Sequence, residues 1–165
     1  MGLRALILLT ALVAAASVAG EATAGVATAP CTTAGLVVWL DTAGNSGAGS
    51  TFLTLKFTNQ SGHACVLTGY PGVSALDLRG HILGSPASRN PSTTRAVRLA
   101  DGATASAALR IVQAANFPPA SCNRRAAAGL RVFPPNQTVS KVVPLPFEAC
   151  AHTGPVFLNV KAVSG

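Results

Sequence analysis

The stretch that decides the fold class reads FLTLKFT, from Phe52 to Thr58. Apolar and polar residues alternate there from Leu53 onward, so Leu53, Leu55 and Phe57 fall on one face of an extended segment. The residues between them are polar and fall on the opposite face. This period of two predicts a β-strand that buries one face and exposes the other.

The same pattern recurs along the chain and predicts eight or nine strands. The further candidates are residues 36–40, 73–78, 96–99, 103–112, 130–133, 139–143 and 156–161. Turn-forming residue types separate them, at 44–47, 59–62, 79–80, 101–102 and 134–136. We therefore predict an all-β fold, an immunoglobulin-like antiparallel β-sandwich stapled by two disulfides. The alternative is a closed barrel, which the spacing does not distinguish from a sandwich.

Two segments depart from the simple strand pattern. Residues 124–128 (Arg-Arg-Ala-Ala-Ala) predict at most a short helical turn, which Gly129 ends. Pro144 and Pro146 cannot donate backbone hydrogen bonds, so we expect residues 143–147 at a sheet edge or in a loop.

The first segment has the pattern of a secretory signal peptide. Arg4 is the only charge before Glu21, the stretch between them is short and mainly apolar, and residues 22–24 (Ala-Thr-Ala) match a cleavage site. We predict a signal peptide over 1–24, with residues 17–19 as the second choice of site, and a single β-sandwich domain over 25–165. The apolar run falls short of the roughly 20 residues of a membrane span, so we expect no stable transmembrane anchor.

Composition excludes two classes of protein. Hydrophobic residues make up 49% of the chain and charged residues 10%, which is unlike a disordered protein. The chain has no second long apolar run, which is unlike a polytopic membrane protein. Removal of residues 1–24 takes away Arg4 and Glu21, so the net charge stays at +7.

The cysteines form an even set: Cys31, Cys65, Cys122 and Cys150. In an exported chain such a set predicts two disulfides. Pairing of nearest neighbours gives Cys31 with Cys65 and Cys122 with Cys150, and we adopt it as the prediction; the nested and crossed connectivities are the alternatives. Pro30 before Cys31 does not fit a lipobox, which leaves Cys31 free to pair.

A metal site is the competing use of these cysteines. His63 lies two residues before Cys65, and His152 lies two residues after Cys150, a spacing that puts both side chains on one face of a strand. However, the chain has no C-x-x-C motif, and Met1 is its single methionine. We predict no metal, and no cofactor, since phosphate-binding glycine loops are also missing from the sequence.

Several motifs resemble one exported family. The most specific is C-x-L-x-G-Y-P-G at Cys65 to Gly72, and others are at residues 31–36, 52–59, 117–122, 129–135 and 147–150. Together they resemble the actinobacterial exported family called domain of unknown function 4232, over the whole mature chain. The resemblance implies an immunoglobulin-like sandwich and an exported location, and it implies no activity and no catalytic residues. Many members resemble lipoproteins or membrane-tethered proteins, and this chain departs from them by having no lipobox.

The mature chain has few acidic residues that could take part in catalysis. The sequence has no G-x-S-x-G motif of a serine hydrolase. Asp77 near His81, across a hairpin at Arg79-Gly80, is the best acid–base candidate, and a solvated hairpin charge explains it more simply. We therefore predict a protein that is not an enzyme.

Basic residues give the main cue to function. Arg89, Arg95 and Arg98 lie in a loop-rich stretch and are candidates for contact with an anionic envelope polymer or an acidic protein. Arginine-rich turns that only maintain solubility are the simpler explanation. Nucleic acid is not expected, because basic and aromatic residues are not interleaved. Trp39, Phe52 and Tyr70 are candidates for an exposed binding face.

Two function classes follow. The first is an exported, non-enzymatic binding or interaction module of the cell envelope or extracellular space. The second is a secreted inhibitor-type protein that presents a rigid loop to a protease, from residues 86–98 or 134–138. A disulfide close to the presented loop would favour the second.

Overall fold

The computed structural model describes residues 27–165, and the predicted signal peptide (1–24) lies outside these residues. Within them the chain forms eleven strands and two short helical segments. These are β1 (Leu36–Gly47), β2 (Ser50–Asn59), β3 (Cys65–Leu67), β4 (Gly72–Leu76), β5 (Ile82–Leu83), β6 (Ser88–Arg89), β7 (Val97–Leu99), β8 (Thr104–Val112), η1 (Ala114–Asn116), α1 (Pro119–Cys122), β9 (Arg124–Phe133), β10 (Lys141–Cys150) and β11 (Leu158–Val160). The all-β prediction is confirmed.

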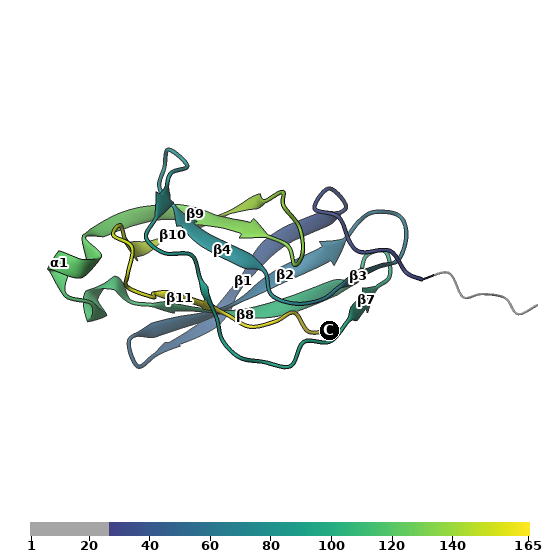
Figure 1. Cartoon of the computed structure of the whole chain (residues 1–165), viewed down its shortest axis with the longest axis horizontal. Helices are drawn as coiled ribbons and strands as arrows, with labels where there is room; N and C mark the ends of the chain where they lie inside the picture. Colours follow the sequence, from purple (N-terminus) through teal and green to yellow (C-terminus); the bar gives the residue numbers. More distant parts are fainter. Residues whose placement is uncertain (1–26) are drawn as a thin grey trace, which may run out of the picture.

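The strands form two main layers (Figure 1). One is a five-stranded sheet in the order β1-β2-β8-β11-β6, and the other is a four-stranded sheet in the order β10-β9-β4-β5; β3 and β7 form a small third sheet. Strand neighbours are antiparallel except for β11 and β6, which are parallel. That exception joins strands far apart in the sequence, as parallel pairing requires a long connection.

One hydrophobic core fills the space between the layers. Leu53, Leu55 and Phe57 of β2 are buried, as their alternation predicts, and Leu130 and Val132 approach from β9 of the other sheet. Burial of such side chains is the main stabilising contribution to a fold of this kind. Thr54, Lys56 and Thr58, which alternate with these residues, point away from the core.

The predicted turn at 44–47 is wrong. Strand β1 continues to Gly47, and the chain reverses at Ala48 and Gly49, both with positive φ (47° and 67°). The pairing of β1 with β2 is irregular between Asp41 and Asn45. Gly44 lies in this bulge, where a Cβ atom would be 1.9 Å from the carbonyl oxygen of Phe52. Glycine is needed there for close approach of the strands rather than for a turn.

The predicted helical turn at 124–128 is also wrong, because these residues begin β9. Their backbone pairs with the end of β10, with Arg124 opposite Cys150. Five residues make a poor isolated helix, and the ladder supplies the hydrogen bonds instead. The edge prediction for 143–147 is confirmed: β10 is an edge strand, with an irregularity between Pro144 and Phe147.

Two disulfides join Cys31 to Cys65 and Cys122 to Cys150, the nearest-neighbour pairing. Their cysteines are at most 2% exposed. One lies beside β3 and the other at α1, and these elements are at opposite ends of the long axis in Figure 1. The chain is therefore cross-linked by one disulfide at each end of the sandwich.

Candidate functional site

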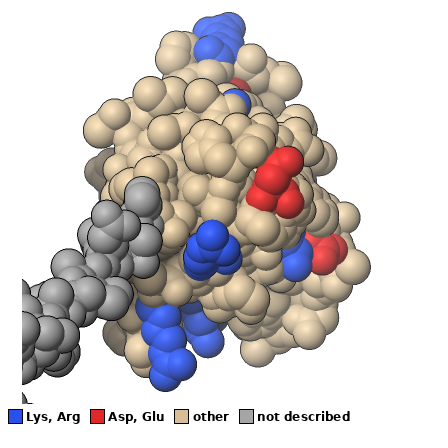
Figure 2. All heavy atoms as spheres, turned by 90° about the vertical axis from the view of Figure 1, so that its right-hand side faces the viewer, with Lys and Arg blue, Asp and Glu red and all other residues tan. Residues whose placement is uncertain are grey.

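Basic side chains dominate the charged surface. The ion pair that the structure has within residues 27–165 joins His81 Nδ1 to Asp77 Oδ2 at 3.3 Å. No lysine or arginine in this part of the chain has a carboxylate oxygen within 4.0 Å. Figure 2 views the β3–β7 end and shows basic groups at the top, centre and bottom of this face, with the larger acidic groups on the right. Anions therefore meet cations that are not already neutralised.

The three arginines singled out from the sequence lie along one connection. Arg89 is in β6, Arg98 is in β7, and Arg95 lies between these strands; all three are exposed. Arg98 Nε donates a hydrogen bond to Thr28 Oγ1 at 3.4 Å, whereas the Arg89 guanidinium lies 5.6 Å from the centre of the Tyr70 ring. They share a region, but their neighbours differ.

Arg89 contributes to a surface hollow of about 490 Å³. We call it the Tyr70–Arg89 hollow, and it is lined by Gly69, Tyr70, Gly72, Arg89, Thr94, Phe133, Pro134, Asn136 and Gln137. The lining combines a cation, two aromatic rings and two carboxamides. Such a combination suits a ligand that is anionic and also has hydrogen-bonding groups.

The C-x-L-x-G-Y-P-G segment forms one wall of this hollow. Cys65 and Leu67 are buried in β3, and Gly69 has a φ of +104°, a conformation that glycine adopts without strain. Tyr70 follows, and Gly72 begins β4 opposite Phe133. A Cβ atom at Gly72 would lie 3.4 Å from that of Phe133, so glycine here allows close contact with the aromatic side chain.

The Tyr70 hydroxyl is held by one residue of the β6–β7 connection. It donates to the Ser92 carbonyl at 3.0 Å and accepts from the Ser92 backbone N–H at 2.9 Å. The Ser92 hydroxyl in turn accepts from the Ala162 N–H at 3.0 Å. These bonds hold the Tyr70 ring against the connection that follows Arg89. The ring that contacts the Arg89 guanidinium is thus fixed in position.

A second arginine lies over the other aromatic ring. The Arg131 guanidinium is 5.5 Å from the centre of the Phe133 ring, and its buried Nε has no hydrogen-bond partner in the structure. Asn136, at a φ of 59°, donates from Nδ2 to the Thr68 carbonyl at 3.0 Å. The sequence does not connect Arg131, Phe133 and Asn136 with Tyr70, because they are about 60 residues away and share no local pattern with it.

The Asp77–His81 pair is part of a hairpin turn. Asp77 Oδ1 accepts from the backbone N–H groups of Arg79 and His81, each at 2.8 Å. The hydrogen bond from the His81 backbone is the main reason that the pKa of Asp77 lies below its ordinary value. The carboxylate thus caps the turn. This position agrees with the simpler explanation of Asp77, a solvated charge in a hairpin.

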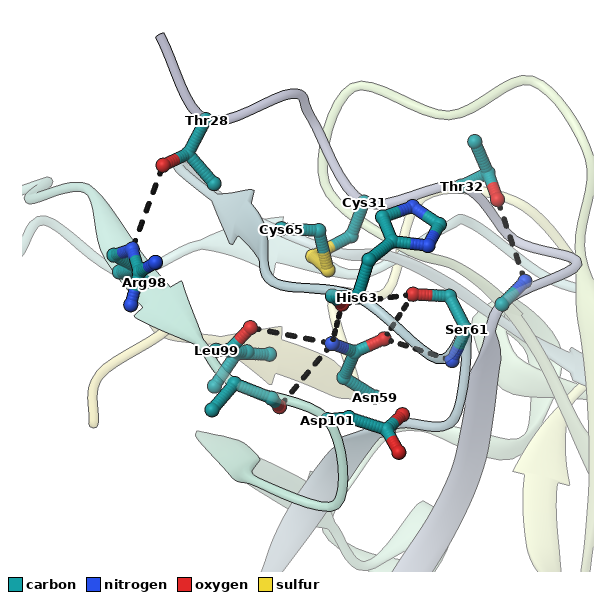
Figure 3. The surroundings of a disulfide bond; sticks show 12 residues. Thr28, Cys31, Thr32, Asn59, Ser61, His63, Cys65, Arg98, Leu99 and Asp101 are labelled. Atoms are coloured by element: carbon teal, nitrogen blue, oxygen red, sulfur yellow. Dashed lines mark hydrogen bonds between the residues drawn. A yellow bond between two sulfur atoms is a disulfide. The ribbon is translucent and has the colours of Figure 1, made fainter. Parts of the chain in front are cut away.

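The other two histidines lie near the disulfides. His63 is exposed close to Cys31–Cys65, and its carbonyl accepts from Asn59 Nδ2 at 2.7 Å (Figure 3). His152 is within 3.3 Å of the Ala120 carbonyl and of Asn123 Nδ2. Because the neighbouring cysteines are disulfide-bonded, neither histidine has a thiolate beside it for a metal.

Both loops considered for an inhibitor are held against the body of the protein. In the first, the Asn90 N–H donates to the Val160 carbonyl at 2.8 Å, and Ser92 binds Tyr70. In the second, Gln137 Oε1 accepts from the Thr33 N–H at 3.2 Å. The Cys31–Cys65 disulfide does lie next to the first loop, because β3, which begins at Cys65, pairs with β7 at the end of that loop.

The three aromatic candidates separate into two environments. Trp39 and Phe52 are 42% and 43% exposed, and both lie on the outer face of the five-stranded sheet. Tyr70 is half-buried in the hollow. The prediction that these aromatic side chains are exposed is correct for Trp39 and Phe52.

Within residues 27–165, no helix is long and apolar enough to cross a membrane. No curated protein and no solved structure matched the chain. A family model described as "Domain of unknown function (DUF4232)" matches residues 31–164, which include both disulfides and all strands of the part of the chain that the structure describes. The chain therefore belongs to the domain of unknown function family DUF4232.

Proposed function

We propose that this protein is an exported, non-enzymatic binding module that holds an anionic group of an envelope polymer in the Tyr70–Arg89 hollow. The observation that carries the proposal is the Arg89 guanidinium, which lies over the Tyr70 ring without a carboxylate partner. A guanidinium supported by an aromatic ring keeps its N–H groups free for an anion.

Export is part of this proposal. Two buried disulfides agree with an oxidising compartment, and the pattern over residues 1–24 agrees with a cleaved signal peptide. The mature protein then meets carboxylate- or phosphate-bearing polymers outside the membrane. Its net charge of +7 favours association with them.

A binding role without catalysis agrees with the histidine environments. Asp77 is occupied by two backbone N–H groups, and His152 is engaged by the neighbours of α1. In the described residues, neither side chain has a hydrogen bond to a serine or cysteine side chain. We expect substitution of His63, His81 or His152 by Ala to leave binding unchanged.

The test is co-sedimentation of the purified secreted protein with isolated cell envelopes. The test variant changes Arg89, Arg95 and Arg98 to Gln. The matched control triple changes Arg79, Arg124 and Arg125 to Gln; these are exposed arginines outside the hollow, so both variants lose three positive charges. The single variant Arg89→Gln isolates the hollow.

We expect the wild type and the control triple to sediment at low salt, and the test triple and Arg89→Gln to sediment to a clearly smaller extent. Raising NaCl from about 0.05 M to about 0.2 M should weaken wild-type binding by roughly 20-fold, as expected for about three cation contacts. Equal binding by both triples, or binding that ignores salt, contradicts the proposal. A histidine variant that abolished a turnover would contradict the non-enzymatic part.

A further inference from the structure

The outer face of the five-stranded sheet is a second exposed surface, and hydrogen bonds hold several of its side chains in place. We call the outward side chains of β1, β2, β8 and β11 the sheet face. Across it, Trp39 lies opposite Lys56, and Phe52 lies opposite Arg110. The two aromatic rows are four residues apart along β2, or about 13 Å at the rise of a strand. The aromatic rings are therefore separate platforms rather than one apolar patch.

Hydrogen bonds fix the polar side chains beside Trp39. Trp39 Nε1 donates to Thr58 Oγ1 at 3.0 Å, and that hydroxyl lies 2.8 Å from Thr104 Oγ1. Lys56 Nζ donates to Ser106 Oγ at 3.1 Å. Side chains that are already ordered lose little conformational freedom when a ligand binds.

The sheet face is hollowed around Ala108, whose small side chain leaves a depression of about 280 Å³. Phe52, Arg110, Asn159 and Lys161 surround it. The Arg110 guanidinium lies 5.9 Å from the Phe52 ring centre, and its Nε donates to Ser50 Oγ at 2.9 Å. The depression thus has one aromatic wall and two cationic groups.

Charge on the sheet face favours an acidic ligand. Lys56, Arg110 and Lys161 have no carboxylate within 4.0 Å in the described residues. Asp41 is the acid of this face, and its Oδ1 accepts from the Ala43 N–H at 3.0 Å. Protein partners generally bury a contiguous apolar centre, which the spaced Trp39 and Phe52 do not provide. A saccharide matches the face better, because its C–H surfaces stack on separate rings while its hydroxyls meet Thr, Ser and Asn.

We propose that the sheet face binds an acidic saccharide chain, which packs on Trp39 and Phe52 and places carboxylates on Arg110 and Lys161. The site is separate from the Tyr70–Arg89 hollow, and the inference does not depend on the function proposed for the hollow. A chain of sugars can cover both aromatic platforms at once, which gives the face a preference for polymers over single sugars.

The experiment measures binding of the secreted full-length protein to polygalacturonate by titration calorimetry at about 0.05 M NaCl. Dextran is the neutral saccharide control, and polyglutamate is the control for charge without sugar. We expect polygalacturonate to bind at least roughly tenfold more tightly than either control, because it combines the contacts of both. Equal affinity for polyglutamate would overturn the saccharide assignment.

Variants then locate the site. Trp39→Ala and Phe52→Ala should each weaken polygalacturonate binding by roughly tenfold, the effect of removing an aromatic contact. Val142→Ala is the matched control, since Val142 is 65% exposed on the other sheet. The triple Lys56→Gln, Arg110→Gln and Lys161→Gln should lose binding, while Arg89→Gln and the control triple defined above should keep it.

Thermal unfolding of each variant checks that it is folded, and chemical-shift mapping of the wild type gives a readout without any substitution. Shifts should concentrate at Thr54 and Ala108 and spare Val142. Shifts confined to Gly69–Gly72, or aromatic variants that bind like the wild type, would overturn the proposal. In that case the affinity for saccharide would lie in the Tyr70–Arg89 hollow.

Discussion

The side-chain amide of Asn59 donates a hydrogen bond to the main-chain carbonyl of Leu99 at 3.2 Å and thereby joins the end of β2 to β7 (Figure 3). The same Nδ2 lies within hydrogen-bonding distance of the carbonyls of His63 and Ala100, and Oδ1 accepts from Ser61. Asn59 is 0% exposed. A fully satisfied buried carboxamide thus connects three segments beside the Cys31–Cys65 disulfide.

Replacement of Asn59 should destabilise the fold. Asn59→Ala leaves buried carbonyls without a donor, and we expect the free energy of unfolding to fall by about 2 to 4 kcal/mol. Asn59→Asp should be no better, because a carboxylate cannot donate. Urea denaturation measures both. Asn116→Ala, which removes one exposed hydrogen bond to Gly49, is the control, and a loss of similar size there would contradict the explanation.

The two disulfides should contribute similarly to stability. They close loops with sequence separations of 34 and 28 residues, which correspond to about 3 to 4 kcal/mol each by loop-closure entropy. Paired Cys→Ala variants of each bond, compared by denaturation, test this. Because all four cysteines are buried, we also expect neither bond to react with reductant under native conditions. Rapid alkylation of Cys31 and Cys65 in the native protein would count against that expectation.

Gly84 should tolerate alanine less well than Gly80, although both have positive φ (63° and 82°). A Cβ atom at Gly84 would lie 2.5 Å from the Cys150 carbonyl oxygen and 2.8 Å from Phe157 Cε1, whereas nothing lies within 4 Å at Gly80. The backbone strain is common to both variants, so the difference between them reports packing. We expect Gly84→Ala to lose about 1 to 3 kcal/mol more. Equal melting temperatures of the Gly84→Ala and Gly80→Ala variants would contradict this expectation, because they would show that the atoms around Gly84 move to make room for the methyl group.

Asp77 should titrate below the ordinary aspartate range. The backbone hydrogen bond from His81 is the largest cause of its lowered pKa. A carboxyl group whose pKa is lower in the folded state stabilises the fold above its unfolded pKa, and that stabilisation is lost as the pH falls through the folded value. Asp77 therefore stabilises the fold at neutral pH, and this stabilisation is lost only at pH values below about 4. NMR titration of Asp77, with Asp77→Asn as the control, measures it; a midpoint above about 4 would contradict the assignment.

The mature protein should begin at Gly25. The prediction follows from Ala-Thr-Ala at residues 22–24 after a short apolar stretch. The intact mass of the exported protein decides it directly. A secreted species that still contains Met1 would exclude cleavage.

The alternation around Leu55 in β2, and that around Ala107 in β8, was readable from the sequence. Burial of every second residue is a local consequence of strand geometry, so it leaves a local pattern. The even number of cysteines in a chain with an export pattern predicted two disulfides for a similarly simple reason. Strands β3, β5 and β6 have two or three residues, too few to show a period, and they were not predicted. Strands β7 and β11 have three residues each but lie within the predicted ranges 96–99 and 156–161.

Other features depended on residues far apart in the chain. Whether 124–128 forms a helix or a strand was decided by its pairing with the end of β10, and Gly44 was placed in a bulge by its contact with Phe52. The hollow brings Tyr70 together with Arg89 and Phe133, and the sheet face brings Phe52 together with Arg110. Sequence alone determined which residues of the long alternating strands β2 and β8 are buried, because that depends on near neighbours. Only the tertiary structure decided which exposed side chains meet, because strand order and register are set by the packing of the whole core.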